Sequence, residues 1–208
     1  MITEKQVLAW LELSATVMAE NKEFLTDLDA AIGDADHGIN MNRGFSKVKD
    51  KLAGLAGKDI GTILKTTGMT LMSSVGGASG PLYGTVFMKA GQALAGKTEL
   101  GSDDLCTLFQ SGRDGIVQRG KAVAGDKTMF DVWAPVVEVA DANKGQDPLA
   151  LLEMCVATAE EARDATAPMQ AKKGRASYLG ERSIGHIDPG AASSTLLLAA
   201  LCDTIKGG

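Results

Sequence analysis

Residues 29–40 read DAAIGDADHGIN and place three aspartates, Asp29, Asp34 and Asp36, in the spacing D-x4-D-x-D. Like charges at short range repel one another, so crowding them in this way does not stabilise a fold. A hard cation such as Mg²⁺ relieves the repulsion, because it prefers oxygen ligands and completes its shell with water and phosphate. Gly33 and Gly38 allow the backbone to bend tightly around the carboxylates. The stretch predicts a metal site, and a solvated acidic loop is the alternative interpretation.

The composition around this stretch favours a helical protein. The 208 residues are enough for one domain with a sizeable core, and only 4% of them are aromatic. Alanine, leucine, methionine and glycine are abundant, which favours helix-on-helix packing over a β-sandwich. We therefore expect an all-α protein in which residues 1–208 form a single domain, and we expect no β-strand.

Charge and cysteine usage exclude several classes of protein. The net charge is −5 and no basic stripe is visible, which argues against a nucleic-acid-binding protein. No apolar run is long enough to span a bilayer, and the first residues lack the pattern of a signal peptide. Cys106, Cys155 and Cys202 lie in apolar helical patterns, as buried reduced thiols do. These features predict a cytoplasmic protein without membrane contact.

Hydrophobic periodicity places most of the chain in helices. Thr3 and Gln6 form a capping-box pattern at the start of the first one. A short helix over residues 23–31 leads into the aspartates. The other helices are expected over residues 3–21, 41–55, 60–75, 82–95, 102–119, 128–139, 148–167 and 191–201, and we expect about eight helices in all.

Residues 76–81, GGASGP, connect two of these helices. Pro81 suits the first turn of a helix, with Ser79 or Gly80 as its cap. Free backbone N–H groups at such a helix start form an anion site. A tight helix–helix connection needs the same small residues, so both interpretations stay open at this point.

Residues 91–98, GQALAGKT, match the P-loop pattern G-x4-G-K-T. A true P-loop follows a buried strand and opens a helix. This match instead ends a helix, with Gly96 as its C-cap and Lys97 near the negative end of the helix dipole. We therefore reject a P-loop.

The segment from Met169 to Ile187 has no helical or strand periodicity and is the most basic part of the chain. Loops of this length in compact domains are usually functional. Its lysines and arginines suit an acidic partner surface or plain solvation equally well. Together with the aspartates and a glycine-rich loop at residues 120–127, it supplies the groups that bind a polyphosphate. Three carboxylates would repel ADP, whose charge is about −3, unless cations such as two Mg²⁺ intervene.

Several motifs resemble the nucleotide-binding domain of dihydroxyacetone kinases, in the same order and over essentially the whole chain. They are residues 33–38, 74–81, 125–129, 174–183 and 188–191. The resemblance implies a closed barrel of eight antiparallel helices with the nucleotide at one end.

The resemblance also implies the site residues. Asp29, Asp34 and Asp36 would hold two Mg²⁺ ions that bridge the phosphates of ADP. The implied nucleotide contacts are His37, Gly38, Ile39 and Asn40 beside the metal, Ala78 and Ser79 at the phosphates, Gly120 and Met129 at the adenine, and Arg175, Asp188, Pro189 and Gly190 closing over it.

The family has two forms. In one, this domain follows a dihydroxyacetone-binding domain and uses ATP. The other is a free-standing subunit in which bound ADP is rephosphorylated by a phosphohistidine protein of the phosphotransferase system. The length of this chain and residues 179–183, LGERS, are similar to the second form. The expected partners are then that phosphohistidine protein and a dihydroxyacetone-binding subunit, with a homodimer left open. A non-catalytic nucleotide-binding module and a Mg²⁺-dependent hydrolase are the rival classes.

Overall fold

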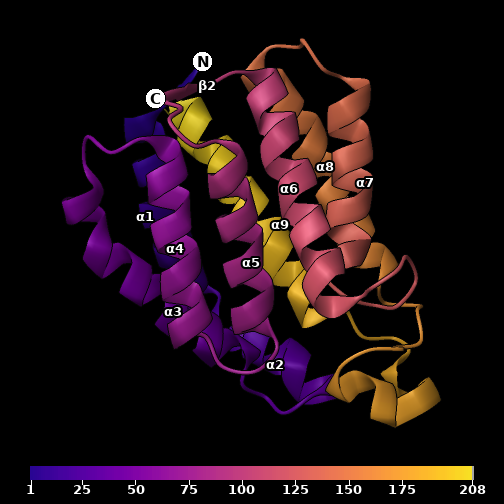
Figure 1. Cartoon of the computed structure of the whole chain (residues 1–208). Coiled ribbons are helices and arrows are strands. Elements are labelled where there is room, and N and C mark those ends of the chain that lie inside the picture. Colours follow the sequence, from indigo (N-terminus) through magenta and orange to yellow (C-terminus); the bar gives the residue numbers. More distant parts are fainter. Residues whose placement is uncertain (208) are drawn as a thin grey trace.

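The computed structural model describes residues 1–207, and its regular structure is almost entirely helical (Figure 1). Its α-helices are α1 (Glu4–Glu20), α2 (Lys22–Ile32), α3 (His37–Leu52), α4 (Ile60–Ser74), α5 (Ser79–Ala93), α6 (Ser102–Gly120), α7 (Phe130–Ala142), α8 (Pro148–Ala165) and α9 (Pro189–Gly207). Two 3₁₀ segments are η1 (Ala53–Leu55) and η2 (Arg175–Ser183). None of the helices in residues 1–207 is both long enough and apolar enough to cross a bilayer.

Two short strands correct the expectation of a strand-free chain. β1 (Ile2–Thr3) pairs antiparallel with β2 (Glu99–Leu100), and Ile2 lies opposite Leu100. A pairing of two residues per strand is too short to show alternation of apolar and polar residues, which is the signal that sequence patterns detect.

Helices with a local cap begin where the sequence indicates. The N–H of Gln6 donates to Thr3 Oγ1 over 3.3 Å and the N–H of Thr3 donates to Gln6 Oε1 over 2.9 Å, so the capping box at α1 is confirmed. At α8, Asp147 Oδ2 accepts the N–H groups of Leu149 and Ala150.

Two helix starts differ from the expectation, and both lie at the candidate site. α3 begins at His37, four residues earlier than expected, because a carboxylate oxygen of Asp29 caps it from the preceding helix. α5 begins at Ser79 with Ala78 as its N-cap, so Ser79 and Gly80 lie inside the helix and do not cap it. Neither cap belongs to the short-range patterns of residue types that identify a helix start.

The segment expected to be irregular contains η2, and the last helix runs from Pro189 to Gly207, beyond the expected residues 191–201. A 3₁₀ segment has i to i+3 bonds and therefore shows no 3.6-residue period. α7 begins at Phe130 and not at residue 128, because the Thr128 N–H is bonded to a carboxylate oxygen of Asp131.

The P-loop-like residues 91–98 lie at the end of α5 and lead into β2, as the rejection of a P-loop requires. Gly96 is in the left-handed region, with φ +77°. The ammonium of Lys97 pairs with Asp104 Oδ1 at 3.0 Å, and the Lys97 carbonyl accepts the N–H of Ile60. These groups hold the starts of α4 and α6 against the end of α5.

The helices pack in a continuous order of neighbours. α1 packs against α3, α3 against α4, and the order of neighbours continues through α5, α6, α7 and α8 to α9. α9 packs against α1 and so closes the order. In Figure 1 both termini lie at one end of the molecule, whereas α2 and η2 lie together at the other end.

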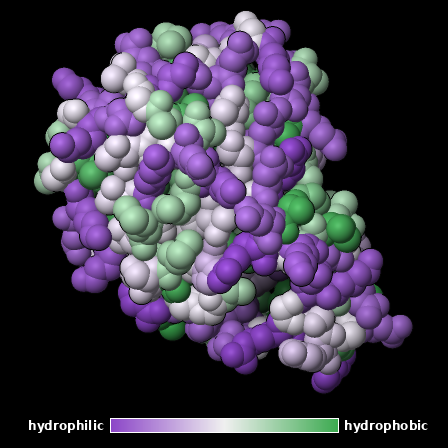
Figure 2. Space-filling view, viewed as in Figure 1, coloured by the Kyte–Doolittle hydropathy of each residue, from purple (hydrophilic) through white to green (hydrophobic). Residues whose placement is uncertain are grey.

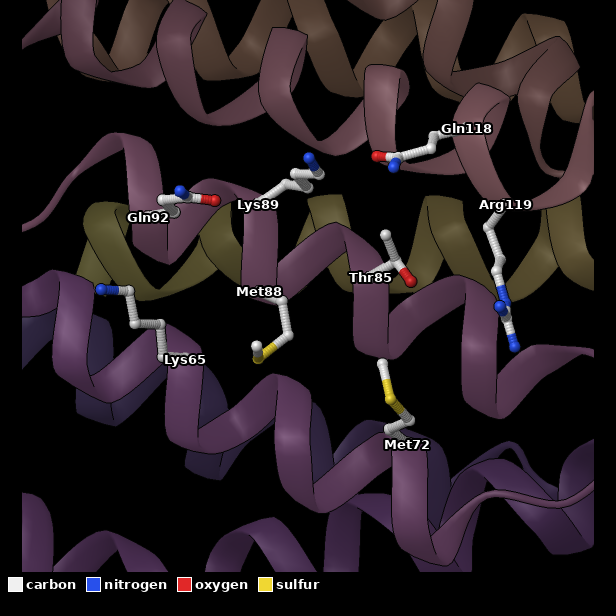
Figure 3. A pocket seen from close by; sticks show the side chains of 8 residues that line it. All are labelled: Lys65, Met72, Thr85, Met88, Lys89, Gln92, Gln118 and Arg119. Atoms are coloured by element: carbon white, nitrogen blue, oxygen red, sulfur yellow. The ribbon is translucent and has the colours of Figure 1, made fainter.

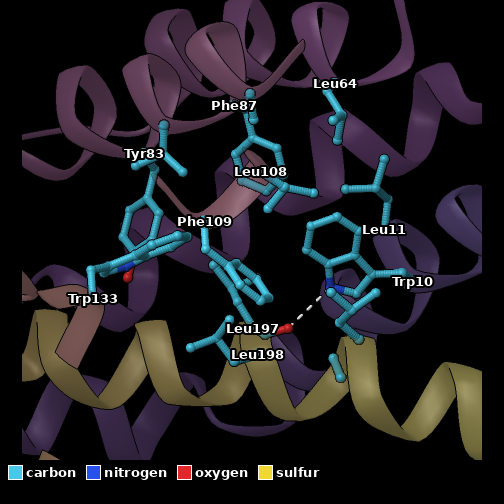
Figure 4. Close-up of a cluster of buried hydrophobic side chains, with 14 of the residues drawn as sticks. Trp10, Leu11, Leu64, Tyr83, Phe87, Leu108, Phe109, Trp133, Leu197 and Leu198 are labelled. Atoms are coloured by element: carbon cyan, nitrogen blue, oxygen red, sulfur yellow. Dashed lines mark hydrogen bonds between the residues drawn. The ribbon is translucent and has the colours of Figure 1, made fainter. Parts of the chain in front are cut away.

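An aromatic core fills the space between the helices (Figure 4). Trp10 and Phe87 have ring centroids 5.7 Å apart, and Phe109 lies edge-on to Trp133 at 6.4 Å. The indole N–H of Trp10 donates to the Leu197 carbonyl over 3.0 Å, which ties α1 to the buried helix α9. The three cysteines are buried and unpaired, as expected.

Candidate functional site

The three aspartates of residues 29–40 meet in space. Asp29, in the last turn of α2, and Asp34 and Asp36, in the turn to α3, each place one carboxylate oxygen within 4.8 Å of the other two. Two oxygens bound to one Mg²⁺ lie at most about 4.2 Å apart, given Mg–O distances near 2.1 Å. The cluster therefore needs only a small adjustment to share a divalent cation.

Local backbone geometry builds this cluster. A Cβ atom at Gly33 would lie 2.0 Å from Asp29 Oδ1, so any larger residue would displace that carboxylate. Ala35 is in the left-handed region, with φ +59°, a conformation that costs free energy for a residue with a side chain. The second oxygen of Asp29 accepts the N–H groups of Asp36 at 2.8 Å and His37 at 3.1 Å. The bend that gathers the carboxylates also starts α3.

His37 connects the first turn of α3 to two other helices. Its imidazole is 7% exposed, with Nδ1 3.1 Å from Ser79 Oγ on α5 and Nε2 2.8 Å from Ser193 Oγ on α9. Burial lowers the pKa of His37, although Asp29 and Asp36 act in the opposite direction. A neutral imidazole donates from one nitrogen and accepts at the other, which suits two hydroxyl partners.

The other residues of this turn have different surroundings. A Cβ atom at Gly38 would lie 2.0 Å from the Lys22 carbonyl, so this glycine lets α3 approach α2 closely. Ile39 is half-exposed. Asn40 is buried, accepts a hydrogen bond from Arg43, and lies against the Gly76 backbone. Asn40 therefore places the start of α3 beside the connection between α4 and α5.

A buried hydroxyl network joins α5 to α9. Tyr83 lies on α5, and its hydroxyl contacts Ser193 Oγ at 2.6 Å and Ser194 Oγ at 2.9 Å and donates to the Gly190 carbonyl over 3.2 Å. Burial raises the pKa of Tyr83, so the phenol stays protonated. Sequence reasoning missed Tyr83 and Ser193. The signal in the sequence is three consecutive hydroxyl residues, 193–195, in a helix expected to be buried.

The first turns of α3, α5 and α9 are thus linked through His37, Ser79, Ser193 and Tyr83. Each helix start presents N–H groups without a partner in its own helix and the positive end of the helix dipole. Three such ends beside a carboxylate cluster can hold an anion and a cation together. This arrangement matches the charge pattern of a metal-bound polyphosphate.

The turn before α9 contains more of the predicted residues. Asp188 Oδ2 accepts the Ala191 N–H over 2.8 Å and caps α9, whose first residue, Pro189, is buried. Burial raises the pKa of Asp188 to about 7; the charge of Asp131 adds to this shift, and that of Lys127 opposes it.

The residues expected at the adenine border the same end of the molecule. Met129, 4% exposed, precedes α7 and lies beside Gly190, where a Cβ atom would be 3.5 Å from the Met129 Cβ. Gly120 ends α6 and lies against Leu82 in the first turn of α5. Ala78 and Ser79 form the start of that helix.

Residues 169–187 bring Arg175 to the carboxylates. Arg175 Nε lies 3.0 Å from Asp34 Oδ2, and the Arg175 side chain is 71% exposed. In Figure 2 the part of the molecule that contains η2 forms a lobe, with a hollow between it and the ends of the helices. The structure therefore gathers the predicted residues from α2 to α9 at one end of the molecule.

A separate cavity of about 490 Å³ lies over the outer faces of α4, α5 and α6 (Figure 3). Its lining residues are Lys65, Met72, Thr85, Met88, Lys89, Gln92, Gln118 and Arg119. None of them belongs to the carboxylate cluster or to the hydroxyl network, so this cavity is distinct from the candidate site.

Comparison with known proteins gives consistent matches. Residues 31–203 match the model of the DAK2 domain. The chain is 54% identical over 208 residues to the PEP-dependent dihydroxyacetone kinase, ADP-binding subunit DhaL, of Escherichia coli, covering 99% of both chains. It is 41% identical over 206 residues to the PTS-dependent dihydroxyacetone kinase, ADP-binding subunit DhaL, of Lactococcus lactis, covering 99% of this chain and all of that one.

A solved structure shows the same fold. The dihydroxyacetone kinase from C. freundii in complex with AMP-PNP and Mg²⁺ superposes with a TM-score of 0.73 at 25% identity. The match covers 95% of this chain and spans 33% of that kinase.

Proposed function

The chain belongs to the DAK2 domain family, and on that premise we propose that it is the ADP-binding subunit of a dihydroxyacetone kinase, a phosphotransferase. Bound ADP takes a phosphoryl group from a phosphohistidine protein of the phosphotransferase system and delivers it to dihydroxyacetone on a partner subunit. The observation that supports this most directly is the carboxylate cluster at the meeting point of three helix starts.

We assign the metal to the carboxylates. Asp29, Asp34 and Asp36 hold two Mg²⁺ ions, which bring the local charge from −3 to about +1 before the nucleotide binds. Such a centre neutralises the charge of the phosphates and orients them, and phosphoryl transfer needs little else from side chains. No catalytic nucleophile is required of this chain.

The nucleotide contacts follow the geometry of the helix starts. The N–H groups at Ala78 and Ser79, at the start of α5, would face the phosphates, and His37, Gly38, Ile39 and Asn40, at the start of α3, would lie beside the metal. Gly120 and Met129 border the adenine, and Arg175 with residues 188–190 closes over the nucleotide. Arg175 supports this role because it already reaches Asp34.

We infer that the helices form a closed barrel of eight antiparallel members. The order of neighbours α1, α3, α4, α5, α6, α7, α8 and α9 returns to α1, and α2 packs outside this order against α3 and α9. The nucleotide site then lies at the end of the barrel that α2 and η2 cover.

The partners and the compartment follow from the proposed reaction. A dihydroxyacetone-binding subunit and a phosphohistidine donor protein each dock at the nucleotide end in turn. We place the reaction in the cytoplasm, where the buried reduced cysteines of this chain are stable. The proposal does not depend on a homodimer.

A second candidate is an ATP-using kinase domain, the form to which the C. freundii kinase with AMP-PNP and Mg²⁺ belongs by its fold, although the relatives described as ADP-binding subunits do not favour it. The two candidates differ in what becomes of the nucleotide. A retained cofactor stays on the protein through many turnovers, whereas a substrate exchanges at every turnover.

Native mass spectrometry of the purified chain tests the site chemistry. We expect a mass increment that matches ADP plus two Mg²⁺. Asp34→Ala should lose the increment, while Asp27→Ala, a change at an exposed aspartate of α2 outside the cluster, should keep it. An unmodified mass for the wild-type chain, or an increment that survives in Asp34→Ala, would contradict the proposal.

A further inference from the structure

Lys127 is a buried cation that the proposed chemistry does not use. Its side chain is 1% exposed. The ammonium donates to the carbonyls of Ala167 at 3.2 Å, Met169 at 3.0 Å and Ser183 at 2.7 Å. An ammonium group has three hydrogens, so backbone carbonyls satisfy all of them. Burial lowers the pKa of Lys127 and the charge of Asp188 opposes this shift.

The three carbonyls belong to the two ends of one segment. Ala167 and Met169 lie where the chain enters residues 169–187, and Ser183 lies where η2 ends. The same base has further bonds: the Ala171 N–H donates to Ser183 Oγ over 2.9 Å, and the Gly185 N–H donates to the Ala167 carbonyl over 2.7 Å. Lys127 therefore closes the segment into a loop at its base.

The backbone of the turn that contains Lys127 directs its side chain toward these three carbonyls. Lys127 has φ +62°, a left-handed conformation that costs free energy for a residue other than glycine. Asp131 holds the turn, because its carboxylate accepts the N–H groups of Gly125 at 2.6 Å and Thr128 at 2.9 Å. Asp126 Oδ2 accepts the Val123 N–H over 3.0 Å, and the Asp126 carbonyl accepts the N–H of Lys172.

The far side of the same segment reaches the carboxylate cluster. Arg175 pairs with Asp34, and η2 packs beside α2 at the nucleotide end (Figure 1). The segment thus spans from the Lys127 anchor to the candidate metal ligands. The base of the segment is buried and held by these hydrogen bonds, whereas Arg175 and Tyr178 at its tip are largely exposed.

We propose that Lys127 is a positioning residue that anchors residues 169–187 over the nucleotide and thereby slows the release of ADP. The proposal rests on the function proposed above. Lys127 has no contact with the carboxylate cluster, so its role is to hold the covering segment. If ADP leaves when the base of this segment opens, the three bonds of the ammonium add to the barrier. Loss of one charge-assisted hydrogen bond then changes the release rate by about tenfold or more.

Two variants test this. Lys127→Met removes the three bonds and keeps the length of the side chain. Ser183→Ala removes the hydroxyl that accepts the N–H of Ala171 and donates to the Gly180 carbonyl. This change leaves only a small void, so it still provides a test if Lys127→Met fails to fold. Lys51→Met is the matched control, because the same substitution is made at an exposed lysine in the last turn of α3, outside residues 169–187.

The measurement is the release rate of radiolabelled ADP, chased with excess unlabelled ADP in Mg²⁺, together with the melting temperature of the nucleotide-free protein. We expect release to be about tenfold faster or more in Lys127→Met and severalfold faster in Ser183→Ala, with Lys51→Met equal to the wild type. In Lys127→Met and Ser183→Ala, hydrogen exchange should increase at the backbone amides of Ala171, Lys172 and Gly185, which are bonded at the base of the segment.

A merely structural role makes a different prediction. If Lys127 only stabilised the fold, both variants would melt at a lower temperature and would release ADP at the wild-type rate. That result would overturn this inference and leave the proposed function standing. A wild-type chain that retains no ADP would overturn the proposed function and this inference with it.

Discussion

Asp29 has two roles at the candidate site. One of its oxygens caps α3, and the carboxylate also belongs to the cluster with Asp34 and Asp36. The side chains of Asp34 and Asp36 accept no hydrogen bond from the start of α3, so their replacement removes proposed metal ligands and leaves the Asp29 cap of α3 in place. This difference makes Asp34 and Asp36 the better positions for mutation.

Asp34→Ala and Asp36→Ala should each lose bound nucleotide and melt at a lower temperature than the wild type in ADP and Mg²⁺. The reason is linkage: a ligand at about 100 times its Kd stabilises the folded state by about 2.7 kcal/mol. Thermal unfolding with and without EDTA measures the effect. A variant that keeps stoichiometric ADP and the wild-type melting temperature would refute the assignment.

Lys97→Ala should leave nucleotide affinity and phosphoryl transfer unchanged, because Lys97 pairs with Asp104 at the start of α6 and lies outside the site. Isothermal titration with ADP and Mg²⁺ provides the check. A hundredfold loss, or about 2.7 kcal/mol, would show that the P-loop-like residues bind phosphate after all.

Tyr83→Phe should destabilise the protein by about 1–3 kcal/mol, because it removes the hydrogen bonds that the buried phenol makes to Ser193, Ser194 and the Gly190 carbonyl. Chemical denaturation measures the change. Phe24→Leu, at an exposed site on α2, is a control for aromatic content. Equal stability of Tyr83→Phe and the wild type would mean that the hydroxyl network does not hold α5 against α9.

At the scale of single residues, the meeting of Asp29, Asp34 and Asp36 could be predicted, because their spacing places the three carboxylates around one turn, and their role as metal ligands stays a prediction. Tyr83, Ser193 and Lys127 could not be identified in the same way. A serine in an apolar helix or a lysine in a glycine-rich loop is ordinary in sequence, and only the partners in space, such as the three carbonyls around Lys127, give it a role.

At the scale of elements, the distance to the capping group decides which helix starts are visible in the sequence. Thr3 and Asp147 cap helices one to three residues away, and both starts were predicted. α3 is capped by Asp29, eight residues before His37 in the chain. Short-range patterns therefore fail at the turn where the site is built.

The cap of α9 makes the stability of the nucleotide-free protein depend on pH. The pKa of Asp188 is about 7 in the folded state, above its ordinary value of 3.8, so the folded state binds this proton more tightly. Between these two values stability falls as pH rises, and the contribution is fully lost above pH 7.

Asp188→Asn should therefore reduce the loss of stability between pH 4 and pH 7, because the amide remains uncharged and can still accept the N–H of Ala191. Urea denaturation at several pH values measures the slope. An unchanged difference in stability between pH 4 and pH 7 would contradict the raised pKa.

At the scale of the whole molecule, the all-α class followed from composition and periodicity, whereas the adjacency of distant elements did not. Sequence order puts His37 and Ser193 156 residues apart, yet their side chains are 2.8 Å apart. The helix order that returns from α9 to α1 produces this contact. The family resemblance implied that residues 33–38 and 188–191 share one end of the molecule, but it did not identify the contact with Ser193.

The central claim is that the chain retains ADP and relays a phosphoryl group. The covering segment and its anchor support slow exchange, which suits a cofactor. An ATP-using kinase must instead release its nucleotide at every turnover. The two accounts therefore differ in one measurable quantity, the exchange of bound nucleotide with the solution during turnover.

The most direct measurement follows ³²P from a labelled phosphohistidine donor protein to dihydroxyacetone, with the purified chain, the dihydroxyacetone-binding subunit and excess unlabelled free ADP. The account predicts label in dihydroxyacetone phosphate only when every protein is present, with no label in the free nucleotide on the turnover timescale. Product formed from free ATP as fast as from the phosphohistidine donor would contradict it.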